Sequence, residues 1–135
     1  MICDAKGVPL AVRLTAANVN DVTQLQPLVE AIPPLRGKRG RPRRRPEAVQ
    51  GDRGYDSQAH RRWLRRLGIQ PVLAERNTEH GSGLGKTRWV VERTLAWLHQ
   101  FRRLRIRWER LARIHEAFLI MGCIIICWNC LQGGF

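Results

Sequence analysis

The sequence predicts an α/β fold in which a mixed sheet is flanked by helices. Short runs of branched apolar residues alternate along the chain with segments whose apolar residues follow helical spacing. Gly, Pro, Asn and Asp separate these segments. The 135 residues, 44% of them hydrophobic, are enough for one domain with its own core.

The first part of the chain is predicted as a hairpin followed by a helix. Residues 8–15 are rich in branched side chains and indicate a strand, with residues 4–7 as the turn before it. Apolar positions from 22 to 32 have helical spacing, and the prolines that follow end that helix. The elements expected here are a strand stub at 2–3, a turn at 4–7, a strand at 8–15, a helix at 22–32 and a loop at 36–46.

The second part is predicted as strand, helix, strand and two long helices. A helix after residue 57 places Trp63 and Leu64 inward and its arginines, Arg61 included, outward, and Gly68 ends it. The remaining elements are a strand at 48–51, a helix from 57 to 67, a strand at 69–73, a glycine-rich linker at 79–87 and helices at about 88–107 and 109–131.

The charge balance indicates a polyanionic partner. The chain has 24 Lys and Arg against 11 Asp and Glu, a formal net charge of +13. Such a field favours nucleic acid, and no free basic amphipathic helix supports an anionic membrane instead. The apolar run at 117–128 is shorter than the roughly 20 residues of a membrane span, so we expect a buried helix there. Cys123, Cys127 and Cys130 fall on one face of this helix and are expected to be core thiols, with a zinc site as the alternative.

Two carboxylates are candidates for chemistry. Asp52 ends the strand at 48–51, in the stretch QGDRGYDS, where open sheets place ligand-binding residues. Glu92 shares a predicted helix face with Arg88 and His99, while Val91, Leu95 and Leu98 are expected to point elsewhere. The alternatives are a turn at Asp52 and an exposed ion pair at Glu92.

The loop at 36–46 is a candidate for DNA binding. Its centre, Arg39-Gly40-Arg41-Pro42, resembles an AT-hook, an extended element whose arginines enter the minor groove. Sequence-independent phosphate binding is the alternative and requires only the charges. The basic residues of the loop are Arg36, Lys38, Arg39, Arg41, Arg43, Arg44 and Arg45.

Three separated motifs resemble the catalytic domain of bacterial insertion-sequence transposases of the DDE type: GVPLAVRLTAANVND, QGDRGYDS and VVERTLAWLHQFRRL. The resemblance covers nearly the whole chain. It implies that residues 1–135 are the C-terminal part of that domain, with the loop at 36–46 and the helices at 88–131 included. It implies a ribonuclease-H-like fold in which three carboxylates hold two Mg²⁺ ions for DNA cleavage and strand transfer. It places two of these carboxylates at Asp52 and Glu92.

The family signature around the glutamate is matched only in part. Arg88 matches its arginine, whereas Gly85 stands at its tyrosine and His99 at its lysine. Arg102 or Arg103 is expected to replace the lysine as a phosphate ligand.

The first aspartate of the family has no counterpart in this chain, so the fold is expected to lack its first strand. We therefore expect the chain alone to be inactive and to need an upstream half, encoded separately or joined by ribosomal frameshifting. The alternative is a non-catalytic basic fragment that occupies element ends, or a decayed copy. By resemblance the protein acts on DNA in the bacterial cytoplasm, as a multimer and without a membrane.

Overall fold

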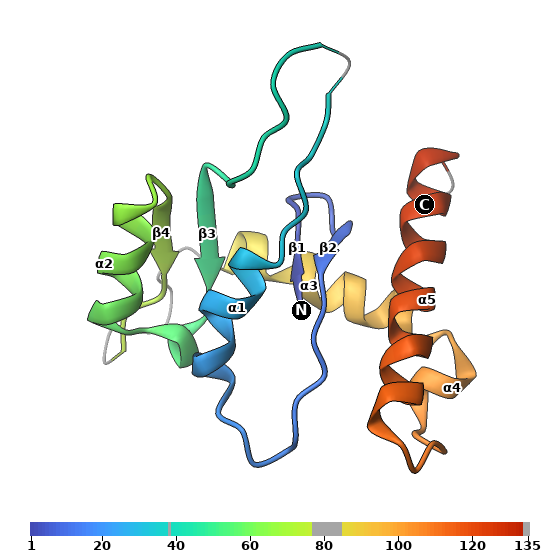
Figure 1. The fold of residues 1–135 in the computed structure, drawn as a ribbon. Helices are drawn as coiled ribbons and strands as arrows, with labels where there is room; N and C mark the ends of the chain where they lie inside the picture. Colours follow the sequence, from blue (N-terminus) through green and yellow to red (C-terminus); the bar gives the residue numbers. More distant parts are fainter. Residues whose placement is uncertain (38, 77–84, 134–135) are drawn as a thin grey trace. The chain divides into compact units, whose positions relative to one another are not determined.

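The computed structural model describes residues 1–37, 39–76 and 85–133, and the side chains of 85–88 lie outside that description. The chain divides into two compact units. Unit 1 comprises Met1–Thr15 and Thr87–Phe135, and unit 2 comprises Ala16–Lys86. The predicted α/β class is confirmed, because short strands and helices alternate along the chain (Figure 1).

Unit 1 begins with an antiparallel hairpin of β1 (Ile2–Cys3) and β2 (Pro9–Ala11). The turn lies at residues 4–7 as predicted, and the Asp4 carboxylate accepts hydrogen bonds from the backbone N–H groups of Lys6 and Val8, each at 2.8 Å. β2 is shorter than the predicted 8–15 because β1 offers only two residues for pairing.

Helix α3 (Gly85–His99) fixes this turn from the other side. The fully buried Thr94 hydroxyl donates to the Gly7 carbonyl at 2.8 Å, and Arg93 donates to the Lys6 carbonyl. The Arg93 guanidinium stacks between Trp89 and Trp97, 4.5 and 4.8 Å from the ring centres. Gly7 has a φ of 82° and its Cβ position is 3.0 Å from the Thr94 hydroxyl, so glycine alone fits here without strain.

Two further helices complete unit 1, α4 (Arg102–Arg105) and α5 (Ala112–Leu131). The predicted helix at 88–107 is interrupted because Phe101 adopts an extended backbone conformation and packs its ring against the core. That core centres on Leu98, Cys123 and Ile126. A Cβ on Gly122 would lie 2.9 Å from Leu104, so glycine lets α5 approach α4 closely.

α5 is more exposed than the predicted buried helix. Its apolar side chains Met121, Ile124 and Trp128 are 55–61% exposed, while Cys123 and Ile126 on the other side are buried. Over 18 residues its mean hydropathy is 1.8 and only 17% of that window is buried, so its length and composition would allow it to cross a membrane. A single helix of this kind is weak evidence for a span, because core helices of soluble proteins have the same length and composition.

Unit 2 contains a β–α–β motif, with β3 (Ala48–Gly51), α2 (Gln58–Arg66) and β4 (Gln70–Leu73). The strands pair in parallel, Ala48 opposite Gln70 through Gly51 opposite Leu73. A short 3₁₀ helix, η1 (Asp21–Gln24), leads into α1 (Leu25–Glu30), and Asn20 caps η1 through the Val22 N–H at 3.1 Å. The buried apolar residues among the described part of the unit are Leu25, Leu28, Val29, Ile32, Val49, Leu64, Ile69, Leu73 and Ala74.

The predicted single mixed sheet is not what the described strands form. They form a two-stranded antiparallel sheet in unit 1 and a two-stranded parallel sheet in unit 2. Both types of pairing are therefore present, but in separate sheets.

Leu64 is a point at which unit 2 is sensitive to truncation. Its side chain is fully buried on the inner face of α2. We expect Leu64→Ala to lower the free energy of unfolding by about 2–5 kcal/mol, because the cavity adds to the lost apolar burial. Chemical denaturation measures the change, with Leu131→Ala as the matched control, since Leu131 is 82% exposed. Equal effects of the two substitutions would contradict the observed packing.

Candidate active site

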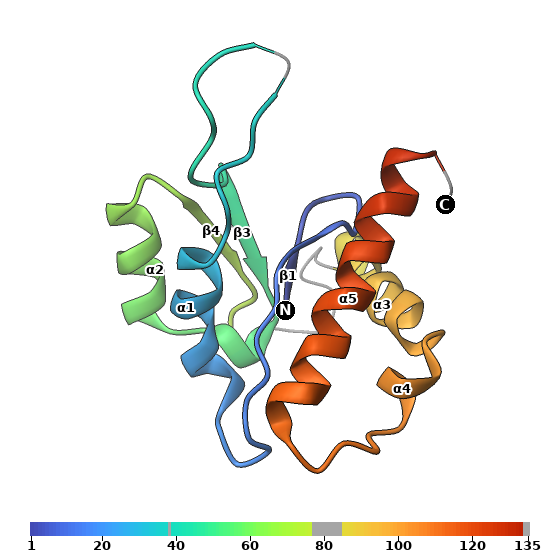
Figure 2. The ribbon, with the colours of Figure 1, turned by 45° about the vertical axis from the view of Figure 1, so that its right-hand side comes forward.

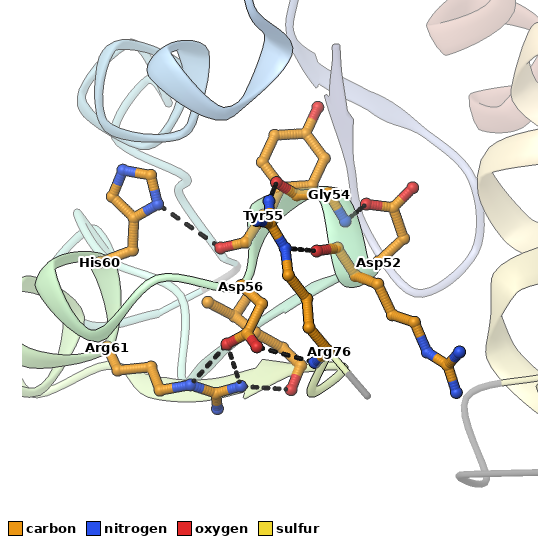
Figure 3. A network of polar contacts seen from close by, with 9 residues as sticks. Asp52, Gly54, Tyr55, Asp56, His60, Arg61 and Arg76 are labelled. Carbon is orange, nitrogen blue, oxygen red and sulfur yellow. Dashed lines mark hydrogen bonds and ion pairs between the residues drawn. The ribbon is translucent and has the colours of Figure 1, made fainter. Parts of the chain in front are cut away.

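The turn after β3 places the Asp52 carboxylate at the C-terminal end of the parallel sheet. Asp52 has an extended backbone and caps a short 3₁₀ helix, η2 (Arg53–Tyr55), by accepting the Gly54 N–H at 2.9 Å (Figure 3). The side chain is otherwise exposed. The predicted turn at Asp52 and the predicted position of Asp52 at the end of the strand are therefore both confirmed.

The glycines around Asp52 are explained by close approaches. A Cβ on Gly51 would lie 2.9 Å from the Leu73 side chain, so glycine allows the ends of β3 and β4 to meet. A Cβ on Gly54 would lie 3.0 Å from the Asp52 carboxylate oxygen that its N–H binds. A side chain at position 51 would require the Leu73 side chain to shift, and one at position 54 would crowd the Asp52 carboxylate itself.

A second aspartate holds this turn against the end of β4. The Asp56 carboxylate accepts Arg61 Nε at 3.2 Å and Nη2 at 2.8 Å, and it accepts the Arg76 N–H at 2.8 Å (Figure 3). Arg61 also donates to the Leu73 carbonyl at 2.9 Å. The segments that leave β3 and β4 are thereby tied through one carboxylate.

Arg76 closes the network from the other direction. Its guanidinium donates to the carbonyls of Arg53 at 3.1 Å and Gly54 at 3.3 Å, the two residues next to the Asp52 carboxylate in the turn. The hydrogen bonds from Arg76 and Arg61 hold the pKa of Asp56 below its usual value. Partial burial, and then the charges of Asp21 and Asp52, raise the pKa of Tyr55.

The prediction that Arg61 points outward is wrong. Arg61 is 8% exposed, because it lies three residues before Leu64 and therefore shares its inner face of α2. Neither Asp56 nor Arg76 was identified from the sequence as part of the site. The position of Arg61 on the apolar face is the signal that could have identified the network.

Glu92 belongs to unit 1. It lies on the exposed side of α3, as does His99 in the last turn. Val91 and Leu95 are 44 and 41% exposed on that same side, contrary to the expectation that they point elsewhere, whereas Leu98 is buried. Arg88 is in the first turns of α3, with its side chain outside the described part of the structure.

The two arginines expected to replace the family lysine have different surroundings. Arg102 is exposed at the start of α4. Arg103 forms an ion pair with Glu109 at 2.8 Å and lies over the Phe118 ring at 5.3 Å. This hydrogen bond from Arg103 holds the pKa of Glu109 below its usual value. Arg103 is therefore already engaged within unit 1.

The basic loop, residues 36–46, extends away from the helices and strands of unit 2 in both views (Figures 1 and 2). Its base is closed by an antiparallel pair between Leu35 and Arg43, with N···O distances of 2.8 and 2.9 Å. Arg43 pairs with Glu47, and Arg45 donates to the Leu67 carbonyl at 3.0 Å. Lys38 lies outside the described residues. The remaining arginines of the loop are exposed, and none of them forms an ion pair with another described residue; they are Arg36, Arg39, Arg41 and Arg44.

The ligand chemistry of the candidate residues suits a metal ion. Carboxylate oxygens such as those of Asp52 and Glu92 suit Mg²⁺. Within the described residues, no three His, Cys, Asp or Glu side chains gather closely enough to hold an ion. Cys123, one of the predicted core thiols, is buried, and burial raises its pKa.

The Asp56 network predicts a specific dependence of stability on pH. Because the folded pKa is lowered, the stabilisation is complete above the unfolded value of about 3.9 and is lost as pH falls through the lower folded value. Asp56→Asn should therefore lower the melting temperature at pH 7 and converge with the wild type toward pH 2. The exposed Arg43–Glu47 pair gives the control, since Glu47→Gln should have little effect at any pH. An Asp56→Asn deficit that is equal at pH 2 and pH 7 would contradict the assignment.

The chain resembles known proteins in its sequence. The family model described as "Transposase DDE domain" matches residues 1–130. Over 132 residues the chain is 68% identical to "Putative transposase for insertion sequence element IS402" from Burkholderia cepacia, covering 98% of this chain and 63% of that protein. Over 107 residues it is 30% identical to "Transposase for insertion sequence element IS1106" from Neisseria meningitidis serogroup B, covering 72% of this chain and 33% of that protein.

The chain thus spans less than two thirds of the length of each of these curated relatives. No solved structure matches it. The family match extends over nearly the whole chain and includes the Asp52 turn, α2 and the helix that carries Glu92. The chain therefore belongs to the transposase DDE domain family.

Proposed function

We propose that this chain is the C-terminal part of the catalytic domain of a transposase that cleaves and joins DNA at insertion-sequence ends. The observation that carries the proposal is the Asp52 turn, an exposed carboxylate at the end of a parallel strand, held by Asp56 and Arg76. The family match over residues 1–130 supports it. A ribonuclease-H-like arrangement in the complete protein is part of this proposal.

Asp52 and Glu92 are the proposed metal ligands. Bound Mg²⁺, two ions in the complete site, would activate water and then a DNA 3′-hydroxyl for attack on phosphodiesters. One Asp52 oxygen accepts the Gly54 N–H, so this bond fixes the direction of the carboxylate while lone pairs stay available. Glu92 is exposed on α3.

The full reaction is proposed to need a further protein segment. Three carboxylates form the family site, and this chain contributes two of them, while the Burkholderia relative has more than a third of its length outside the match. Mg²⁺ requires near-ideal octahedral coordination, so two protein ligands leave the metal weakly held. An upstream half, encoded separately or joined by frameshifting, would supply the third ligand, and we expect multimers to form on DNA in the cytoplasm.

DNA contacts are proposed for the basic loop, its Lys38 included, and for the basic groups near Glu92. In unit 1 the candidates are Arg88, His99, Arg102 and Arg103. Arg102 is the better phosphate ligand of the last two, since Arg103 would have to leave Glu109.

A non-catalytic role is the second candidate. The net charge of +13 favours DNA binding whether or not metal is held. A basic fragment of this kind would occupy element ends without cleaving them, and a decayed copy would behave in the same way.

The catalytic assignment is tested in a chimera in which this chain replaces the matched segment of the Burkholderia relative. We expect Asp52→Asn and Glu92→Gln each to reduce Mg²⁺-dependent cleavage of element-end DNA by at least about a hundredfold, because each removes a metal ligand. Glu30→Gln, an exposed carboxylate on α1, is the control and should retain activity. Full cleavage by either ligand variant would refute the assignment.

The basic loop is tested by salt dependence. Replacing its seven basic residues by Ser should weaken duplex binding and flatten the plot of log affinity against log salt. If the loop neutralises roughly five phosphates, the wild-type affinity falls by two to three decades between about 50 and 200 mM salt. An unchanged slope in the Ser variant would show that the loop makes no phosphate contacts.

A further inference from the structure

The outer face of α2 carries only positive charge. Arg62, Arg65 and Arg66 are exposed, and their spacing of three and four residues puts them on one face of the helix. The other exposed residues of α2, Gln58 and Ala59, are uncharged, and the helix contains no Asp or Glu.

These arginines are not neutralised within the part of the chain that the structure describes. None of the three takes part in an ion pair there, and Arg62 donates only to the Gln58 carbonyl of its own helix, at 3.3 Å. Like charges at this spacing destabilise a helix by about 0.2–0.5 kcal/mol per pair. By contrast, Arg61 on the inner face is paired with the Asp56 carboxylate and donates to the Leu73 carbonyl. The outer face therefore has a cost in the free protein that a bound polyanion would remove.

α2 connects the two regions of unit 2 that are proposed to act on DNA. It begins at Gln58, just after the Asp52 turn and its partner Asp56. At its other end, the Leu67 carbonyl accepts Arg45 of the basic loop at 3.0 Å, a favourable place for a cation because the C-terminus of a helix is the negative end of its dipole. Figures 1 and 2 both show α2 beside β4 in this unit.

The dimensions fit a DNA backbone. From Arg62 to Arg66 the helix rises about 6 Å, which is close to two phosphate steps of one strand along the duplex axis. Arginine forms paired hydrogen bonds with phosphate oxygens, and such contacts position a duplex without reading its sequence.

We propose that the arginine face of α2, comprising Arg62, Arg65 and Arg66, is a phosphate-binding track for duplex DNA that links the Asp52 turn to the basic loop. The inference rests on the proposed action on DNA and adds a surface that none of the sequence motifs identified. It assigns these arginines to holding the duplex backbone in line with the candidate carboxylate.

The test compares two triple variants of the full 135-residue chain that lose the same charge. Arg62→Gln, Arg65→Gln and Arg66→Gln together remove the track and keep helix propensity nearly unchanged. The control changes Arg105, Arg110 and Arg113 to Gln, all exposed in unit 1. Fluorescence anisotropy with duplexes of several sequences, at about 50 to 200 mM salt, measures the slope of log affinity against log salt.

We expect the track variant to lose about 2–3 in that slope, equally for all sequences, and the control to lose much less. The melting temperature of the track variant should not fall below that of the wild type. If the track variant binds DNA with the wild-type slope, the proposed track is wrong while the proposed function stands. If both variants lose slope equally, the effect comes from net charge and the track is wrong as well. Absence of DNA binding by the wild type would overturn the proposed function as well. Loss of binding to vesicles of anionic lipid, with DNA binding unchanged, would assign the face to membranes.

Discussion

The interaction on which the geometry of unit 2 depends is the contact of the Asp56 carboxylate with Arg61 and with the backbone of Arg76. Parallel pairing brings the C-terminal ends of β3 and β4 to one edge, where each strand must leave through a polar segment. A single carboxylate there accepts from a helix side chain and from the next segment, while Arg61 reaches the last carbonyl of β4. Because Arg76 in turn holds the carbonyls of Arg53 and Gly54, the network around Asp56 also braces the turn that carries the candidate catalytic carboxylate, Asp52.

Local patterns were sufficient to predict the elements of unit 2. β3, α2 and β4 follow from short branched runs and a helical stretch that ends before Gly68, and the Asp52 turn follows from its glycines. The network around Asp56 could not be predicted in the same way. Arg61 was expected to point outward because it is charged, and its partners lie outside α2. Helical geometry alone would have corrected this, since a residue three before a buried Leu64 faces inward whatever its charge.

Unit 1 was less predictable because long-range contacts determine it. The apolar spacing from 88 to 107 is continuous, yet the helix stops after His99, since Phe101 turns toward the core and α5 approaches at Gly122. The Glu92 face is likewise mixed, with exposed Val91 and Leu95 beside the carboxylate. Glu92 lies on the exposed side of α3, but its neighbours depend on how the helices pack, which spacing does not encode.

The arginines of this chain fall into two groups, and the distinction bears on function. Arg61, Arg93 and Arg103 are held by carboxylates, carbonyls or aromatic rings at junctions between elements. Those at the tip of the basic loop and on the outer face of α2 form no ion pair among the described residues, and Arg62 donates only to a carbonyl of its own helix. Stability alone would favour acids beside the second group, because repulsion among like charges opposes folding. With 11 acids for 24 basic residues, and Asp56, Glu109 and Glu47 each already paired, the unpaired arginines raise the energy of the free protein. Binding a polyanion would offset that energy, so the same charges that weaken the isolated fold would strengthen the proposed complex with DNA.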